Sequence, residues 1–345
     1  GMFDSTGSPL KKGFDHHFGY NCQRHAHSYF PTFLYNDGVR FDLPGNTGKG
    51  VGPIYAQNVI QTDMLQWVRA KKDQPFFLAV GIAKPHLPFI APKKYWDMYD
   101  HSAIKLANNP FYPENVPLIA LQSQGFSGEI RKKYLDIPKE GNFDDELSRN
   151  LIHGYYASIT YMDALIGELV KNLDDLGLRE NTTIVLWSDH GYLLGEHGMW
   201  TKHCTFREAV KIPLLISSPK YKKHGTTESM TELVDLYPTL CNIAQIKAPS
   251  YLQGESLIPV LENPSTILKK EIYTRYKEGE AIIDNKYSYT EFYKGNEYLG
   301  NMLYDNLKDP KQNKNVSEEP SNAKLVAKYK EKLKVMRTKV NKNPI

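Results

Sequence analysis

The sequence predicts an α/β protein in which helices flank a mostly parallel sheet, followed by a small antiparallel sheet with a terminal helix. Stretches of helical periodicity alternate with short, continuously apolar runs such as PFFLAVGI at 75–82, the pattern of strands that are buried on both faces. After about residue 265 the runs carry tyrosine and isoleucine and are separated by Gly, Asn and Asp turns, which indicates antiparallel strands. We therefore expect a large α/β domain at 1–264 and an α+β subdomain at 265–345.

The first half of the chain is predicted to contain more loop than regular structure. Residues 1–50 are rich in Gly, His, Tyr and Asn and show no sustained period, so we expect loops that lie over a core. Apolar residues at helical spacing predict a helix over 55–72, and the run at 75–82 predicts a buried strand. Residues 93–147 contain too much proline for long helices and are predicted as loops.

The second half shows clearer periodicity. We predict a long amphipathic helix over 151–178, closed by Gly177, and two apolar strands, TTIVLW and IPLLISSP, followed by a short helix at 232–244. The chain closes with a lysine-rich helix at 322–340, whose apolar residues share one face. These residues are Leu325, Tyr329, Leu333, Met336 and Val340. We expect this face to dock on the protein and the lysines to be solvated.

Composition limits the possible functions without choosing one. With 345 residues, 41% of them hydrophobic, the chain is long enough to bury a sizeable core. A net charge of +4 is compatible with anionic substrates but lacks the concentrated positive field of a nucleic-acid-binding protein, so we expect no nucleic-acid partner. No stretch has the apolar length of a membrane span. Three cysteines without C-x-x-C spacing suggest neither a disulfide framework nor a zinc site, and oligomeric state stays open.

Ionisable side chains gather where two predicted strands end. His86 follows the run at 75–82, while Asp189 and His190 follow TTIVLW. In open α/β sheets ligands bind beyond the carboxyl ends of the strands, so the three side chains are expected at one edge. A carboxylate and a neutral imidazole can both ligate a divalent cation, but an Asp-His pair is as often a capped turn. Lys202 is either a surface lysine or an ammonium group that binds a tetrahedral oxyanion.

The complete string SDHGYLLGEHGMWTKH, at 188–203, resembles the sulfatase family, most closely its iduronate-2-sulfatase-like branch. Further matches follow in family order: the loop at 9–31, AKPHLPFIAPKKY at 83–95, the long helix, and the closing motifs QGESLIPVL and MLYDNLKDPKQNKN. The resemblance implies an alkaline-phosphatase-like fold. It also implies hydrolysis of sulfate esters, on sulfated sugars or glycosaminoglycan-type glycans.

The resemblance assigns roles residue by residue. Asp189 and His190 match the family's late pair of metal ligands, with Ca²⁺ or possibly Mg²⁺ as the ion, and Lys202 matches its sulfate-binding lysine. His86 matches the histidine that contacts the sulfate ester and its leaving oxygen. Each role agrees with the chemistry of the side chain, because cationic groups and a metal ion stabilise charge that develops as a sulfur–oxygen bond breaks.

A second set of residues is expected to bind the sugar. The loop that carries Arg24, His25 and His27 should lie over the pocket, where Arg24 suits a substrate carboxylate or a second sulfate. The alternative for these histidines is ordinary packing, since their irregular spacing is not that of a metal site. Of the two other histidines in the motif, His203 is the better candidate for contact with the substrate, and His197 is expected to be structural.

The departures from the family pattern bear on activity. The family's nucleophile is a formylglycine made within a C/S-x-P-x-R motif, and Cys22, Cys204 and Cys241 do not lie in one. The family's early Asp-Asp metal pair and its Lys and His of a GKWHLG-like segment are absent as well. We therefore expect that roughly one hundred residues of a sulfatase are missing upstream, about a small domain, and that this chain alone has little or no activity.

Three causes of the missing segment are open: a misassigned or frameshifted gene start, a split enzyme, or a non-catalytic protein that binds sulfated glycans. A different enzyme class in the same superfamily, the phosphodiesterases and phosphonate hydrolases, is a further alternative. Relatives are commonly exported, so a periplasmic or secreted location is expected by analogy alone.

Overall fold

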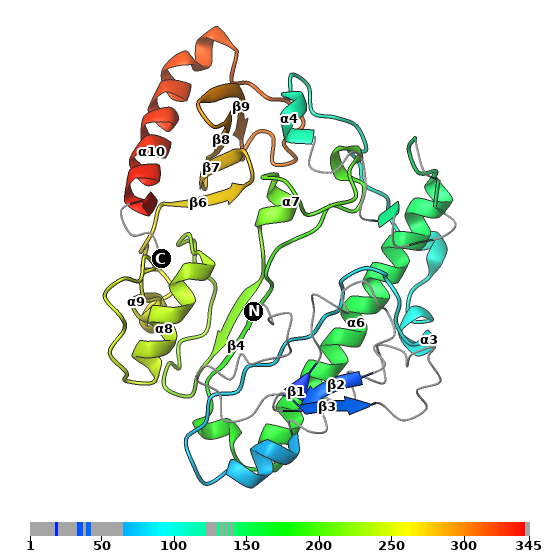
Figure 1. Cartoon of the computed structure of the whole chain (residues 1–345), viewed down its shortest axis with the longest axis vertical. Helices are drawn as coiled ribbons and strands as arrows, with labels where there is room; N and C mark the ends of the chain where they lie inside the picture. The colour runs from blue at the N-terminus through cyan, green and yellow to red at the C-terminus, as the bar shows by residue number, and fades with distance from the viewer. Residues whose placement is uncertain are drawn as a thin grey trace. The chain divides into compact units, whose positions relative to one another are not determined.

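The computed structural model describes the backbone of 18–19, 33–36 and 39–42, together with residues 65–121, 130–131, 134, 137–138 and 141–341 (Figure 1). The chain divides into two compact units. The first unit comprises 1–106 and 130–182, and the second comprises 107–129 and 183–345. Each unit is described by itself below.

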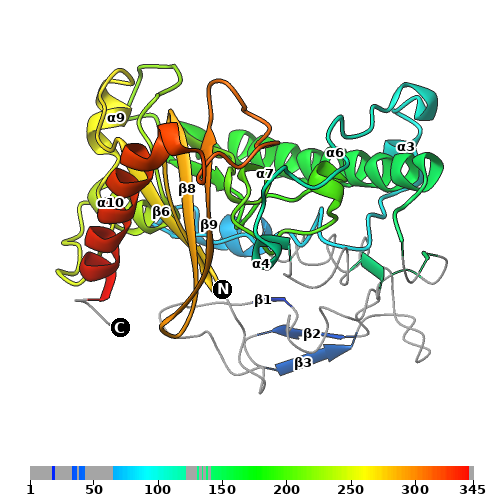
Figure 2. The same cartoon turned by 90° about the horizontal axis from the view of Figure 1, so that it is seen from above.

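The long helix of the first unit is α6, Asp145–Asp175 (Figure 2). Its start is fixed by Asp144, whose carboxylate accepts a hydrogen bond from the Leu147 N–H at 2.7 Å, and two acids follow in the first turn. Its end is fixed by Gly177, which adopts a left-handed φ of 67°. The helix predicted over 151–178 is therefore confirmed, and it begins earlier than its apolar period because of the Asp144 cap.

The buried face of α6 packs against α3, Lys93–Trp96. Tyr95 of α3 lies against Tyr161 with ring centroids 5.3 Å apart, over the buried Ala157 and Leu165. Trp96 stacks on His153, with centroids 3.7 Å apart. These contacts hold α3 against the buried face of α6, the long helix on which this part of the first unit packs.

The amino-terminal part of the first unit contains more sheet than expected. Residues 1–50 are predicted as loops, but three short antiparallel strands are found, β1 Phe18–Gly19, β2 Phe33–Asn36 and β3 Val39–Asp42. Helix is found at 65–71, within the predicted range of 55–72, of which 55–64 lie outside the described residues.

The strand predicted at 75–82 is wrong. These residues are extended and loop-like without a strand assignment, and Phe77 is 62% exposed and Val80 37% exposed. An apolar run becomes a strand only where a neighbouring strand accepts and donates its backbone hydrogen bonds. Among the described residues this run has no such neighbour.

The second unit contains the short helix α4, Leu118–Leu121, and the strand β4, Ile184–Trp187, which pairs with β5, Leu214–Ser217. Both predicted strands are confirmed, but they run antiparallel, whereas the fold class predicts mostly parallel pairing. Trp187 lies opposite Leu214, so the segment between the strands leaves and returns at the same end. A parallel partner would have required a crossover to the opposite end.

A short helical segment follows and is held by a buried ion cluster. It consists of η4, Leu233–Asp235, and α8, Leu236–Ile243, which confirms the helix predicted at 232–244; α9, Ile258–Glu262, comes next. The Lys269 ammonium lies 2.7 Å from a Glu232 carboxylate oxygen and 2.6 Å from one of Asp235. Asp235 is fully buried, and it also accepts the Glu255 N–H at 2.8 Å, so the charge is paired and hydrogen-bonded.

The four-stranded sheet at the end of the chain confirms the predicted small antiparallel sheet. Its strands are joined in sequence order and all pairs are antiparallel: β6 Glu271–Tyr276, β7 Gly279–Asp284, β8 Tyr287–Lys294 and β9 Glu297–Asp305.

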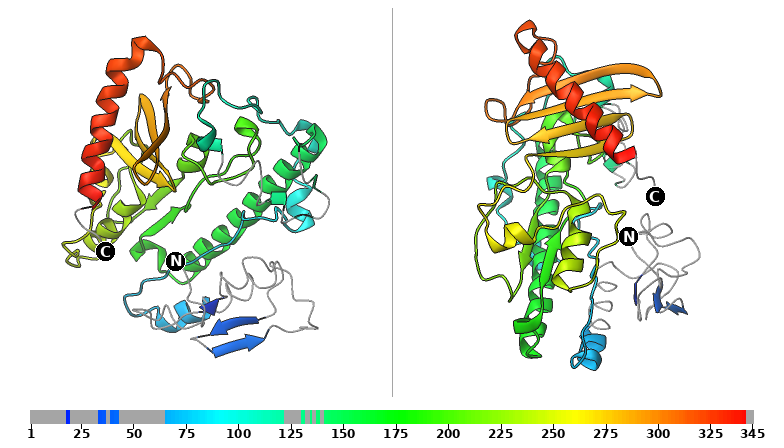
Figure 3. Two further views of the ribbon diagram at one scale, coloured as in Figure 1. Left: turned by 45° about the horizontal axis from the view of Figure 1, so that its top comes forward. Right: turned by 90° about the vertical axis from the view of Figure 1, so that its left-hand side faces the viewer.

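The terminal helix α10, Ala323–Asn341, runs across one face of this sheet (Figure 3). Tyr329 and Leu333 of α10 are buried against Ile282, Tyr289 and Leu303. The predicted apolar face is confirmed for these two residues and for Leu325 and Met336, which pack beside them. The side chain of Val340 lies outside the described residues.

Replacing Tyr329 by phenylalanine is expected to lower the free energy of unfolding by about 2 kcal/mol, because a hydrogen bond to a charged partner is lost. The buried Tyr329 hydroxyl donates to the Asp284 carboxylate, which tethers α10 to the end of β7. Urea unfolding measures the change, with Tyr251→Phe, at a tyrosine that is 60% exposed, as the control. Equal losses in the two variants would contradict the assignment.

Candidate functional site

The loop that follows β4 carries the predicted metal ligands. Asp189 uses one carboxylate oxygen to accept the His190 N–H at 3.0 Å, and its second oxygen lies 3.6 Å from His190 Nε2. His190 Nδ1 lies 2.8 Å from the Gly191 carbonyl oxygen. Because a carbonyl can only accept, Nδ1 carries a proton, and Nε2 is the ring nitrogen that faces the Asp189 carboxylate.

This arrangement fits two ligands of one divalent cation. A hydrogen bond from the second ring nitrogen to a carbonyl is the usual device that orients a metal-bound histidine, and here it turns Nε2 toward a carboxylate oxygen. The Asp189 side chain is 82% exposed, so it is accessible to an ion. Hard cations take six or more oxygen ligands, however, and no group of three or more His, Cys, Asp or Glu side chains in the described part of the chain could hold a metal ion. The pair fits part of a site.

The chain then doubles back, which returns Lys202 to the neighbourhood of the pair. The Leu193 N–H donates to the Thr201 carbonyl at 2.8 Å, and the Gly195 N–H donates to the Met199 carbonyl at 3.0 Å. These two bonds have the spacing of an antiparallel ladder, so Lys202 lies alongside the residues that follow His190. The structure thus places Asp189, His190 and Lys202 on one folded loop.

The tip of the loop needs special backbone conformations. Gly195 has a φ of 110° and Gly198 a φ of 64°, values that glycine adopts without strain. Leu193 and Met199 anchor the two sides of the loop in a core cluster with Phe206. The loop is therefore held by buried side chains as well as by its backbone.

His203 follows Lys202 on the same loop. The ring of His203 stacks on that of Tyr276, with centroids 5.4 Å apart. The backbone N–H of His203 donates to the Thr201 hydroxyl at 3.1 Å. Cys204, the next residue, is buried, and burial raises the pKa of its thiol to about 12. A thiol that holds its proton so firmly is not a nucleophile at neutral pH.

His197, at the tip, is structural, as the sequence predicts. It is completely buried with a φ of 55°, and its ring lies 4.4 Å from that of Phe206. Neither ring nitrogen has a hydrogen-bond partner among the described residues, and Nε2 lies 4.0 Å from a Glu208 carboxylate oxygen that also has none. Burial lowers the pKa of His197 to about 4 and raises that of Glu208.

His86 belongs to the first unit, so it is described separately from the loop of the second unit. It is exposed at the head of a tight loop whose next residues, Leu87 and Phe89, are each 4% exposed. Its Nδ1 lies 2.9 Å from the Leu87 carbonyl oxygen, which makes Nδ1 the protonated nitrogen here as well. The predicted sugar-binding residues Arg24, His25 and His27 lie outside the described residues.

Sequence reasoning missed the residues that support the site. These residues are Lys84 beside His86, Gly191 after His190, and Glu208 beneath the loop, and neither Lys84 nor Glu208 has a distinguishing sequence pattern. Gly191 could have been singled out as a glycine at a strand end, where close backbone approach is common. The other two are recognisable only from their contacts.

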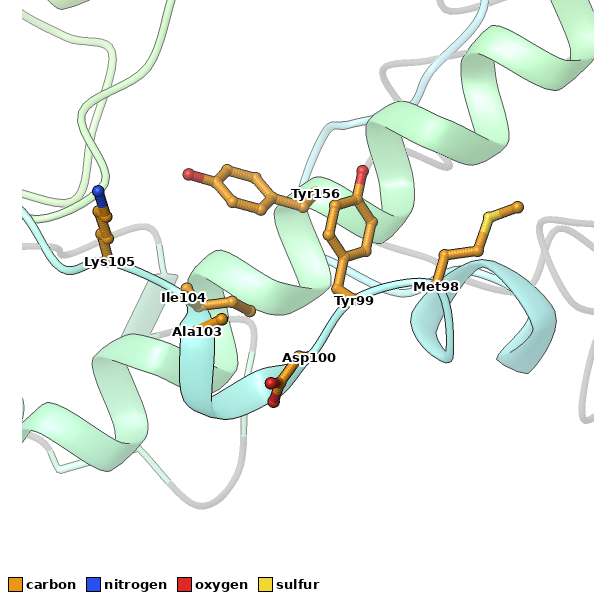
Figure 4. A pocket seen from close by; sticks show the side chains of 7 residues that line it. All are labelled: Met98, Tyr99, Asp100, Ala103, Ile104, Lys105 and Tyr156. Atoms are coloured by element: carbon orange, nitrogen blue, oxygen red, sulfur yellow. The ribbon is translucent and has the colours of Figure 1, made fainter.

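The first unit also has a pocket of about 350 Å³ that contains no predicted site residue (Figure 4). Figure 4 shows Tyr156, on α6, extending toward Lys105, while the Asp100 carboxylate points away from both side chains. That carboxylate accepts hydrogen bonds from the Ser102 N–H and hydroxyl, at 2.9 and 2.7 Å, and so caps the following turn. The pocket offers no acid–base pair for catalysis.

Comparison with known proteins identifies relatives of both parts of the chain. Residues 1–246 match the family profile described as Sulfatase, and residues 195–339 match the profile described as N-sulphoglucosamine sulphohydrolase, C-terminal. A sulfatase of Formosa agariphila is 29% identical over 276 residues, which is 78% of this chain and 50% of the relative. The iduronate 2-sulfatase of Homo sapiens is 32% identical over 208 residues, 51% of this chain and 37% of the relative. The chain thus spans half or less of these relatives.

Solved structures share the fold. A protein in complex with its substrate, D-glucosamine-2-N,6-O-disulfate, superposes with a TM-score of 0.78 at 22% identity, covering 96% of this chain and 77% of the other. A phosphonate monoester hydrolase from Silicibacter pomeroyi gives a TM-score of 0.71 at 22% identity, covering 84% and 60%. The predicted α/β class is confirmed by these likenesses and by the carboxy-terminal antiparallel sheet. In the part of the chain that the structure describes, no helix is long and apolar enough to span a bilayer.

Proposed function

Since the chain belongs to the sulfatase family, we propose that it is part of an enzyme that hydrolyses sulfate esters of sugars, glycosaminoglycan-type glycans included. One observation carries the proposal beyond family membership. The Asp189–His190 pair and Lys202 belong to one folded loop, so two candidate cation ligands and an ammonium group come from the same segment, a combination suited to binding a tetrahedral oxyanion.

Each residue has a part in the proposed reaction. Lys202 binds the sulfate oxygens and offsets the negative charge that builds on them in the transition state. His86, whose Nδ1 donates to a carbonyl, takes up a proton from water at Nε2 and, as the imidazolium, gives that proton to the departing sugar oxygen. His203, with Arg24, His25 and His27, contacts the sugar. Asp189 and His190 hold a divalent cation, Ca²⁺ in this proposal and Mg²⁺ as the alternative, which when bound polarises the sulfate oxygens.

The nucleophile is the missing part. The family's C/S-x-P-x-R motif does not occur in the 345 residues, and Cys204 and Cys241 are both buried. We propose that a formylglycine on a segment outside these residues completes the site. On this proposal the present chain alone gives little or no turnover.

Sulfated sugars are the proposed substrates for two reasons. A structural neighbour was solved with a glucosamine disulfate, and iduronate 2-sulfatases are among the sequence relatives. Within the class of sulfated sugars, the preferred sugar depends on loops such as the one proposed to carry Arg24 to the substrate.

A second candidate is hydrolysis of phosphonate or phosphate esters, favoured by the likeness to phosphonate monoester hydrolases. Both oxyanions are tetrahedral and would use the same lysine. Binding of sulfated glycans without catalysis is the remaining alternative.

The proposed function predicts a specific role for Lys202. In the chain completed with an upstream segment that bears C/S-x-P-x-R, Lys202→Ala is expected to lower kcat/KM for a sugar sulfate about 100-fold, the cost of losing one oxyanion-binding group. Lys222→Ala, at an exposed lysine, is the control and should leave kcat/KM unchanged. Sulfate release by ion chromatography is the measurement.

The outcomes separate the alternatives. Turnover of methyl phosphonate esters above that of sugar sulfates would favour the second candidate. No turnover of either ester, together with equal binding of sulfated and unsulfated sugars, would contradict both the enzyme and the glycan-binding proposals.

A further inference from the structure

The loop that presents His86 is closed by a lysine. The Lys84 ammonium donates to the Pro88 carbonyl at 2.7 Å and lies 3.5 Å from the His86 carbonyl, so one side chain spans the loop. The backbone adds a turn bond from the His86 N–H to the Ala83 carbonyl at 2.9 Å. Hydrogen bonds within the loop thus fix its backbone both before and after His86.

The same loop is fastened to α6. Phe89 packs edge-on against Tyr155, with ring centroids 5.1 Å apart, and its N–H donates to the Tyr134 hydroxyl at 2.5 Å. Its carbonyl oxygen approaches α6 so closely that a Cβ on Gly154 would come within 2.4 Å of it. The far side of the loop therefore cannot move without disturbing the helix.

The Lys84 contacts determine the direction of one particular carbonyl. Lys84 holds the peptide group before the Leu87 carbonyl and the one after it, through the oxygens of His86 and Pro88. The proline ring fixes φ at Pro88, which leaves the Leu87 carbonyl little freedom to rotate. That carbonyl is the acceptor for His86 Nδ1, at 2.9 Å.

We propose that Lys84 is a positioning residue for His86, because it keeps Nδ1 as the nitrogen that donates to the Leu87 carbonyl, so that Nε2 is the nitrogen that takes up a proton from water and passes it to the departing oxygen. The inference rests on the proposed function for its catalytic consequence, but the preferred tautomer of the neutral ring, with Nδ1 protonated, is a property of the loop. Lys84 acts on His86 through the Leu87 carbonyl.

The surroundings of Lys84 agree with this role. Its ammonium group is partly withdrawn from water, and burial lowers its pKa to about 8. It therefore keeps its charge at neutral pH while its hydrogen bonds go to carbonyl oxygens of the loop. A lysine that only covered the surface would leave its ammonium group in water.

The direct test is nitrogen-15 NMR of the His86 ring in the chain itself, with His86→Asn used to assign its signals. The wild-type neutral ring is expected to show Nδ1 as the protonated nitrogen. Lys84→Met, which keeps the length of the side chain without its charge, should shift the ring toward a mixture of tautomers, and Lys84→Arg should restore Nδ1–H. Lys72→Met, at an exposed lysine, is the control.

A kinetic test addresses the consequence in the completed enzyme. Lys84→Met is expected to lower kcat about tenfold on a sugar sulfate with KM unchanged, because a misplaced general acid fails to protonate the leaving oxygen. On p-nitrophenyl sulfate, whose leaving group departs as an anion, the change should stay within about twofold.

The outcomes are distinguishable. An unchanged His86 tautomer in a folded Lys84→Met variant overturns the positioning role, as does an equal loss on both substrates. If the completed chain turns over neither ester while the NMR result stands, the proposed function fails and the Lys84 contact to His86 remains.

Discussion

Substitution of Gly191 by alanine is expected to lower the free energy of unfolding by more than about 3 kcal/mol, at the upper end of what overpacking costs. A Cβ at this position would lie 2.0 Å from the Glu208 carbonyl oxygen and 3.0 Å from its carbon. Both are backbone atoms of α7, Arg207–Val210, which cannot turn aside as a flexible side chain would. The Gly191 N–H also donates to the Ala209 carbonyl at 2.8 Å, so any relief of the clash breaks this bond.

The matched control is an alanine at a glycine with open space around it. Gly167, on the exposed side of α6, would place a Cβ with nothing within 4 Å. Gly167→Ala is expected to stabilise the protein by about 1 kcal/mol, because alanine is the better helix former. Urea unfolding followed by tryptophan fluorescence measures both variants. A Gly191→Ala protein as stable as the wild type would show that the loop and α7 are not in backbone contact.

Stability is expected to fall in acid because of His197. The pKa of His197 is about 4 in the folded protein, against an ordinary value of 6.5, because burial outweighs the attraction of Asp309, and Lys311 adds a repulsion. At pH values between these two pKa values, the His197 imidazole is therefore protonated in the unfolded chain and neutral in the folded chain. The contribution of the neutral His197 to the free energy of unfolding is therefore fully present above about pH 6.5. It is lost as the pH falls to about 4, which lowers the free energy of unfolding by about 3 kcal/mol.

Glu208 changes stability in the opposite sense. Burial raises its pKa, so its carboxyl group costs stability as the pH rises above its unfolded value, and the total pH dependence contains both contributions. His197→Asn separates them, because asparagine tolerates the left-handed backbone and does not titrate.

The measurement is the unfolding free energy of wild type and His197→Asn at several values between about pH 7 and pH 4. The gap between the two proteins should change by about 3 kcal/mol over this range. His224→Asn, at an exposed histidine, should keep a constant gap. A constant gap for His197→Asn would contradict a neutral, buried imidazole.

The sequence predicts elements well where periodicity and turn residues act together. α6 and the presence of an antiparallel sheet near the end of the chain are examples, and spacing alone predicts the apolar face of α10. These elements satisfy their own backbone locally or through adjacent hairpins, so local residues contain most of the information.

The errors arise where structure depends on distant partners. The apolar run that includes Phe77 and Val80 lacks a strand neighbour among the described residues, and β4 pairs with β5 antiparallel, which no apolar pattern distinguishes from parallel pairing. A period of two or a continuous apolar run specifies burial, and it leaves both neighbour and direction undefined.

For the candidate site, motif order predicts Asp189, His190 and Lys202, and their roles stay predictions; the structure shows the three on one folded loop. The supports of that loop, Gly191 and Glu208, are recognisable from the close approach of the Glu208 backbone, which leaves no room for a Cβ at position 191, and from the burial of the Glu208 carboxyl group.

The ion cluster of Lys269 with Glu232 and Asp235 has a consequence for cooperativity. It joins the segment around η4 and α8 to Lys269, which lies just before β6. Glu232 also accepts the backbone N–H of Tyr273, a residue of β6, at 3.0 Å. If either segment opened alone, the fully buried Asp235 would lose its counter-charge, at a cost of several kcal/mol. We therefore expect the helical segment and the carboxy-terminal sheet to unfold as a single cooperative unit, with amide protons of both exchanging through the same opening.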